Sequence, residues 1–169
     1  MIKSFTLSTI IVLCAATAET ALLANIVSLP AVPDFVLLCT LYFSLLNGKT
    51  YGEAAGFVSG LTLDFMTGAP FGFNCIFRTI IGYAEGFFSN ALNFKGIFIP
   101  ALLGACATVS KFLLTYVISL FFPAITLPGG FLTIPFLFEL TANAALSPFV
   151  FKLLSAFEST LLLTRTECI

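Results

Sequence analysis

The sequence has 169 residues, of which 59% are hydrophobic and only 9% are charged. A soluble domain carries about 25% charged residues, so this composition excludes a water-facing surface and predicts a chain solvated by lipid. The net charge of -1 excludes the basic surface that nucleic-acid binding needs. Without any His, the chain holds no Ser-His-Asp or Cys-His catalytic set. The five Cys residues include no CxxC pair, so we expect no metal site and no cofactor.

Six apolar segments follow one another along the chain, separated by Pro, Gly, Asn and charged residues. They cover residues 5–27, 33–46, 51–67, 73–92, 96–122 and 131–157. A helix needs about 20 residues to cross a bilayer, so the second and third segments are short. The first segment also resembles a secretory signal peptide, but its apolar run is longer than a signal core. We predict an all-α fold, a six-transmembrane-helix bundle, that forms a single integral membrane domain over residues 1–169.

Lys and Arg outside the predicted membrane core all fall on one side of the membrane. If the N-terminus is cytoplasmic, the inner segments hold five cations: Lys3, Lys49, Lys95, Lys152 and Arg165. The outer loops, residues 28–32, 68–72 and 123–130, hold neither Lys nor Arg. Because cytoplasmic loops are enriched in these residues, we predict that both termini are cytoplasmic. All loops are short, so we expect no soluble catalytic or binding domain.

Ionisable residues inside a membrane are costly and are usually paired or functional. Asp64 precedes the turn near Pro70 by six residues and Arg78 follows it by eight, so the two side chains should lie at similar depth. By the same count, Lys111 and Glu139 match in depth across the turn between the fifth and sixth segments. We predict that both are intramembrane ion pairs. Structural links that fix helix register are the interpretation we favour, and an ion path or a polar substrate pocket is the alternative.

Glycine recurs every four residues along the third predicted helix and its following turn. The positions are Gly52, Gly56, Gly60, Gly68 and Gly72, with Asp64 at the intervening one. The fourth predicted helix has Gly82 and Gly86 at the same spacing. Four-residue spacing places these residues on one slowly drifting stripe of a helix, and small residues there allow a neighbouring helix to approach closely. We predict that the two stripes meet in a helix-packing seam.

Two further polar features stand at defined places in the predicted bundle. Asp34 follows a proline at the start of the second helix, where a carboxylate accepts hydrogen bonds from free N–H groups, so we predict that it caps this helix. Glu139, Asn143 and Ser147 are four residues apart on the sixth helix and precede a proline. Their spacing predicts a polar stripe that faces the interior of the bundle.

Several short motifs occur in order along the chain. They are Val-Pro-Asp-Phe at 32–35, Gly-Phe-Val-Ser-Gly-Leu-Thr-Leu-Asp at 56–64, Gly-Ala-Pro-Phe-Gly at 68–72, Gly-Tyr at 82–83, and the segment 143–148 from Asn to Pro. In a loop-poor hydrophobic chain of this length, they resemble the family of the rod shape-determining protein MreD. The resemblance implies a non-enzymatic, multi-pass protein of the bacterial cytoplasmic (inner) membrane that binds the bitopic protein MreC.

MreD-like proteins act in the elongation machinery of rod-shaped cells, so the resemblance implies a scaffold that regulates cell shape and peripheral peptidoglycan synthesis. Contacts with the cell-wall synthase pair and the MreB cytoskeleton would be indirect, and membrane lipid would surround the chain. The family's fold is similar to the substrate-binding subunits of energy-coupling-factor transporters. A small-molecule-binding subunit of a membrane transporter is therefore the alternative function, with Asp64, Arg78, Glu139 and Asn143 lining its pocket. The short, apolar outer loops count against it, and a lone Asp64 without an HExxH motif argues against an intramembrane enzyme.

Overall fold

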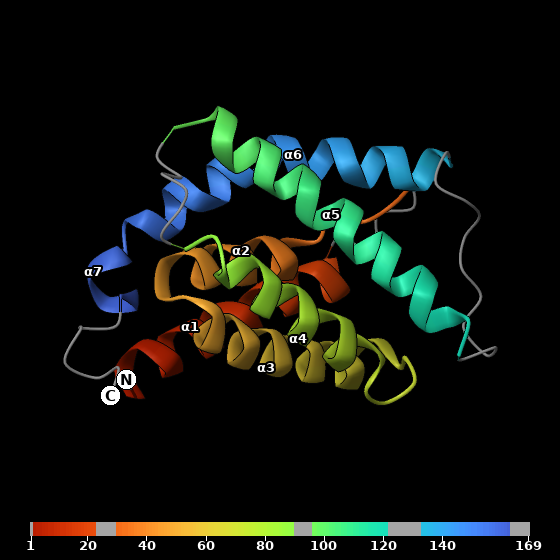
Figure 1. The fold of residues 1–169 in the computed structure, drawn as a ribbon, viewed down its shortest axis with the longest axis horizontal. Coiled ribbons are helices and arrows are strands. Elements are labelled where there is room, and N and C mark those ends of the chain that lie inside the picture. Colours follow the sequence, from red (N-terminus) through yellow and green to blue (C-terminus); the bar gives the residue numbers. More distant parts are fainter. Residues whose placement is uncertain (1, 23–29, 90–95, 122–132, 163–169) are drawn as a thin grey trace.

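The computed structural model describes residues 2–22, 30–89, 96–121 and 133–162, and every regular element within these ranges is a helix (Figure 1). The elements in chain order are α1 (Ile2–Thr17), the π-helical turn η1 (Ala18–Leu22), α2 (Phe35–Asn47), α3 (Lys49–Thr67), α4 (Phe73–Gly86), α5 (Phe98–Ser119), α6 (Ile134–Ser155) and α7 (Glu158–Leu161). The predicted all-α class is confirmed for this part of the chain.

In the described part of the chain, three helical stretches are long and apolar enough to cross a membrane: Lys3–Ala21, Phe98–Ser119 and Ile134–Ser155. The helix α2 is also apolar but has only 13 residues. The helices α3 and α4 have 19 and 14 residues, and they occupy the places of the third and fourth predicted segments. The fourth segment was expected to reach residue 92, whereas α4 ends at Gly86. The lengths and composition of these helices are those of a membrane helical bundle.

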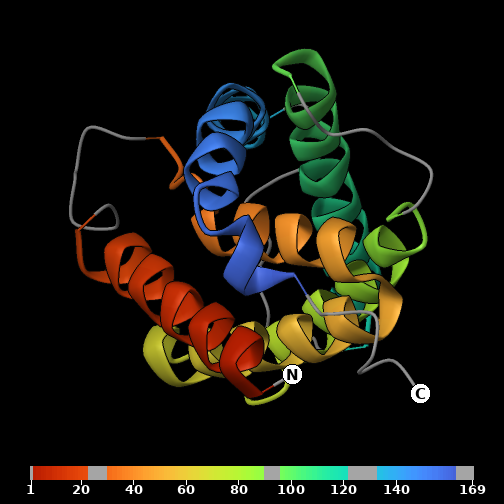
Figure 2. The same cartoon turned by 90° about the vertical axis from the view of Figure 1, so that its left-hand side faces the viewer.

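The central helix of the bundle is α2. All ten residues from Val36 to Leu45 are buried, because α1, α3, α4, α5 and α6 each contact this helix. Figure 2 shows α2 between the α5–α6 pair and the layer formed by α1, α3 and α4. The hydroxyls of Thr40 and Ser44 donate hydrogen bonds to carbonyl oxygens of their own helix. A helix that is apolar all round is buried in this way.

The helices α3 and α4 pack backbone against backbone through their glycines. A Cβ added to Gly52 would overlap the carbonyl oxygen of Gly82, and one added to Gly56 would overlap the carbonyl oxygen of Arg78. A Cβ on Gly60 would lie 2.5 Å from a Cα atom of α4. Real Cβ atoms do not approach backbone this closely, so the contact exists only because these positions carry no side chain.

The predicted glycine stripe divides into two groups with different roles. Gly86 extends the α3–α4 seam, because its added Cβ would overlap the backbone of Lys49 at the start of α3. Gly68 and Gly72 lie in the turn that joins the two helices, with φ of +67° and +89°, and an added Cβ there would meet nothing within 4 Å. The structure therefore corrects the sequence prediction for these two positions. They supply a left-handed backbone, which residues with a side chain disfavour, and take no part in the seam.

Candidate functional site

Asp34 joins three helices through one buried carboxylate. Its Oδ1 accepts the backbone N–H of Leu37 at 2.7 Å, so it caps the N-terminus of α2. Its Oδ2 accepts hydrogen bonds from Arg78 Nη2 on α4 and from Lys111 Nζ on α5, each at 2.7 Å. The residue is 1% exposed. The cap that the sequence indicated is therefore also the centre of an ion-pair network.

The network continues from α5 to α6. Lys111 Nζ lies 2.6 Å from Glu139 Oε1, so the ammonium group is shared between this carboxylate and that of Asp34. The Lys111 and Glu139 side chains are 24% and 19% exposed, whereas Asp34 is closed off. The two residues that depth matching paired are thus in direct contact, at the more open edge of the network.

Asn143 on α6 extends the site through hydrogen bonds of an uncharged side chain. Its Oδ1 accepts the backbone N–H of Asp34 at 2.9 Å, and its Nδ2 donates to Thr108 Oγ1 on α5 at 3.0 Å. The Thr108 hydroxyl in turn donates to the carbonyl oxygen of Gly104 at 2.8 Å. Asn143 is fully buried, so its side chain faces the bundle interior and joins α6 to both α2 and α5.

Thr108 and Gly104 were missed by sequence reasoning, although the sequence holds a signal for them. Pro100, Gly104 and Thr108 are four residues apart on the fifth predicted helix, as Asn143 and Ser147 are on the sixth. The structure brings these two stripes together. Ser147 Oγ donates to the carbonyl oxygen of Pro100 at 2.6 Å, and a Cβ on Gly104 would lie 2.8 Å from the Ser147 Cβ.

Asp64 has partners different from the one that the sequence predicted. Its Oδ2 accepts the backbone N–H of Gly72, and its Oδ1 accepts both the backbone and side-chain N–H groups of Asn74, all at 2.9 Å. Arg78 pairs instead with Asp34. The physical reason is that the N-terminus of α4 offers several unpaired backbone N–H groups and a positive dipole end, which hold the carboxylate in the turn.

The family model for the rod shape-determining protein MreD matches residues 1–157. The chain belongs to the MreD family. No curated protein and no solved structure matches it. The family is one of shape-determining structural proteins rather than a known enzyme family, so membership carries a role in rod shape determination. The matched range contains every residue of the network around Asp34, and the resemblance stated from the motifs is confirmed.

In this MreD-family protein the four linked side chains carry two positive and two negative formal charges, so the network is neutral. Neutrality makes buried charges more tolerable in a low-dielectric interior. Within the described residues the hydrogen bonding is incomplete, because Arg78 Nε and Nη1 are buried without a partner. The arrangement links four helices at one point, which are α2, α4, α5 and α6. Among the described residues, no group of His, Cys, Asp and Glu could hold a metal ion.

One more carboxylate approaches the start of α2. Glu19 lies in the π-helical turn η1, and its Oε2 accepts the backbone N–H of Val36 at a long 3.4 Å. A π-helical turn is rare and often lies at a functional position. In this MreD-family bundle it carries a second carboxylate that faces the positive end of the α2 dipole.

A cavity of about 340 Å³ lies beside the exposed edge of the network. Lys111 and Glu139 form part of its wall, together with aromatic and proline residues from α5, α6 and the segment before α2. The hydroxyl oxygen of Thr115 is buried there and has no hydrogen-bond partner in the described part of the chain. The partly exposed Lys111–Glu139 pair therefore borders this cavity.

Proposed function

We propose that this protein is a non-enzymatic membrane scaffold of the bacterial rod-shape complex, which holds a single-pass MreC-like protein and thereby regulates cell shape and peripheral peptidoglycan synthesis. Membership of the MreD family supports the shape-determining role. The observation that carries the scaffold role is the sharing of Asp34 Oδ2 between Arg78 and Lys111. These buried ion pairs link α2 to α4 and α5, so the charged groups hold the bundle rigid. A rigid bundle presents a fixed surface to a binding partner.

The scaffold crosses the cytoplasmic membrane six times in this proposal, through α1 to α6, with both termini in the cytoplasm. The exposed Lys3, Lys49 and Lys152 then lie on the inner side, as the positive-inside rule requires. Contact between α7 and α1 agrees with this, because it brings the two ends of the described chain to the same end of the bundle (Figure 1). The short helices α2 and α4 extend only about 20 Å, and their neighbours cover the remaining thickness.

Partner binding takes place between helices inside the membrane in this proposal. Helix association in lipid relies on close packing and interhelical hydrogen bonds, because lipid offers no hydrophobic driving force. Lipid covers the remaining apolar faces. The synthase pair and the MreB cytoskeleton are reached indirectly, through the MreC-like protein.

Depletion of the protein in a rod-shaped host is the test of this function. We expect depleted cells to round, and wild-type protein supplied from a plasmid to restore rods. Protein purified in mild detergent should bring down a single-pass MreC-like protein. Cells that keep their rod shape under full depletion would overturn the proposal.

The alternative is a small-molecule-binding subunit of a membrane transporter, with a fold similar to the substrate-binding subunits of energy-coupling-factor transporters. The cavity beside Lys111 and Glu139 is the observation that favours it. Native mass spectrometry of the purified protein decides between the two functions. A stoichiometric small molecule together with a co-purified ATPase module would favour the transporter, and an MreC-like chain without either would favour the scaffold.

A further inference from the structure

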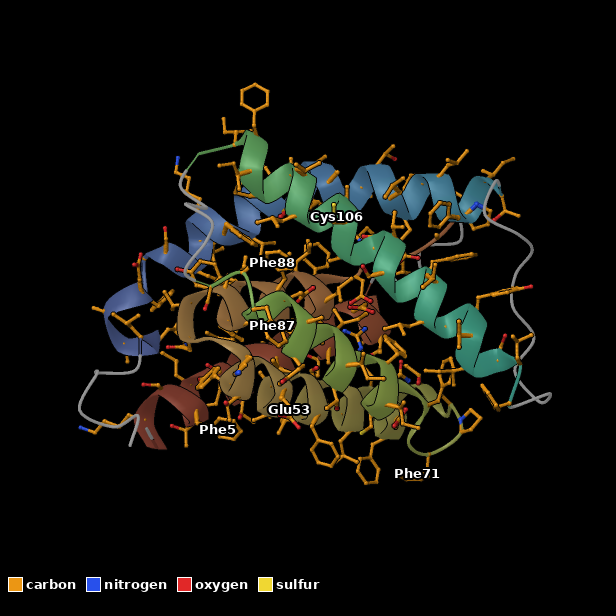
Figure 3. The ribbon with its side chains drawn as sticks, viewed as in Figure 1. Phe5, Glu53, Phe71, Phe87, Phe88 and Cys106 are labelled. Carbon is orange, nitrogen blue, oxygen red and sulfur yellow. The ribbon has the colours of Figure 1, made fainter. Side chains whose placement is uncertain are left out.

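A groove opens on the lipid-facing side of the bundle between α4 and α5. It has a volume of about 300 Å³, and α2 supplies part of its floor. Figure 3 shows Phe88, just beyond the end of α4, and Cys106, on α5, on the same side of the molecule, where both line this groove. Ala84, Cys106 and Ser110 are exposed and small, so a second helix placed over the groove would approach its floor closely.

The groove contains a carboxylate that the bundle does not satisfy. Both oxygens of Glu85 are buried, and neither has a hydrogen-bond partner within the described residues. The network around Asp34 does not include Glu85, and no salt bridge in the described part of the chain reaches it. An unpartnered carboxylate in a low-dielectric site is costly. The groove therefore offers an acceptor that a cation would satisfy.

The level of Glu85 along the membrane normal points to the kind of cation. The next residue, Gly86, packs against the backbone of Lys49 at the start of α3, and the Lys49 ammonium lies 5.2 Å from the ring centroid of Phe87. Lys49 marks the cytoplasmic end in the proposed topology. Membrane-spanning helices carry Lys and Arg at this end, and long basic side chains there reach along apolar surfaces to a polar group.

We propose that the α4–α5 groove docks a membrane-spanning helix of a partner protein, and that a Lys or Arg at the cytoplasmic end of this helix pairs with Glu85. The inference rests on the proposed function in that the partner is the one held by the scaffold. Beyond that function, it identifies the surface that binds the partner and the charge that recognises it. The apolar walls receive the side chains of the partner helix, and Glu85 fixes its depth and register.

Site-specific photocrosslinking in living cells tests this docking surface. A benzophenone amino acid replaces Ser110 in the groove or, as the control, Ile10, which is 55% exposed on α1. We expect the probe at 110 to capture a single-pass membrane protein with Lys or Arg at its cytoplasmic end, and the probe at 10 not to capture it. Glu85→Leu should lower the yield at 110 by about tenfold or more, since an interfacial charge loses its partner. Glu53→Leu, at an exposed carboxylate on α3 (Figure 3), should leave the yield unchanged.

Charge reversal separates direct pairing from loss of folding. Glu85→Lys should abolish capture, and replacing the partner's basic residue by Glu should restore it in that background alone. The inference is overturned by capture of only lipid or a second copy of this chain, by equal capture from 10 and 110, or by a yield that Glu85→Leu does not change. If one of these results is obtained and depleted cells still lose their rod shape, only the docking inference is wrong and the proposed function stands. Rod shape after depletion would remove the proposed function instead.

Discussion

Replacing Asp34 by Asn removes the charge at the centre of the network while it keeps an oxygen that can cap α2. Loss of one partner from a buried ion pair costs roughly 3–5 kcal/mol, because the remaining charge is left buried. Lys111 keeps Glu139 and is partly exposed, so most of this cost falls on Arg78, whose side chain is 2% exposed. We expect Asp34→Asn to lower the free energy of unfolding by about 3–5 kcal/mol.

Three companion variants divide this cost into its parts. Asp34→Ala also removes the cap and should cost about 1 kcal/mol more than Asp34→Asn. Arg78→Met added to Asp34→Asn removes the unpaired cation, so the double variant should be more stable than the sum of the single losses predicts. Glu53→Gln, on the exposed face of α3, is the matched control and should stay within about 0.5 kcal/mol of wild type.

Equilibrium unfolding in mixed micelles of a mild detergent and SDS, followed by circular dichroism, measures these four variants and the single variant Arg78→Met. Equal stability of Asp34→Asn and Glu53→Gln would contradict the predicted cost of stranding Arg78. Simple addition of the Asp34→Asn and Arg78→Met losses would contradict it too, because the two side chains would then not be coupled in the folded state.

The same unfolding assay checks three further predictions. Gly56→Ala should cost about 3 kcal/mol or more, since its methyl group meets backbone, whereas Gly68→Ala should cost about 1–2 kcal/mol through its positive φ alone; equal losses would contradict the division of the glycines. Asp64→Ala should cost about 1.5–3 kcal/mol by removing the acceptor at the start of α4, and its coupling to Arg78→Met should be smaller than that of Asp34→Asn. Asn143→Leu should cost about 1–3 kcal/mol, because it leaves a buried backbone N–H unpaired; wild-type stability would show that the amide is dispensable.

Depth along a hairpin can be deduced from sequence, because each helical residue advances about 1.5 Å. Lys111 and Glu139 are at one level by this count, and in the structure Lys111 Nζ lies 2.6 Å from Glu139 Oε1. Asp64 and Arg78 share a level by the same count, yet depth says nothing about direction around the helix axis or about competing donors. The free N–H groups at the start of α4 donate hydrogen bonds to Asp64. Arg78 faces the interior, where α2 lies.

The central position of Asp34 was beyond the reach of local patterns. Its cap could be predicted from a Pro-Asp start, since capping involves only neighbours in sequence. Its ionic partners lie 44 and 77 residues further along the chain, and only the packing of α4 and α5 around α2 brings them there. Glycine spacing predicted the α3–α4 contact for Gly52, Gly56 and Gly60. The same spacing could not distinguish glycines in the helix contact from glycines in the turn. Glycine is favoured in both places, because the first needs close approach and the second needs a positive φ.

The long sequence separations within the network set an order of events during membrane insertion. Asp34 is translated before either ionic partner, because Arg78 follows 44 residues later and Lys111 follows 77 residues later. At about 5–20 residues per second, the first gap lasts roughly 2–9 s. A carboxylate that entered lipid before its partners would be costly. The second helix therefore gains from staying at the polar insertion site until the fourth arrives, so that α2, α3 and α4 leave it together as one assembled unit.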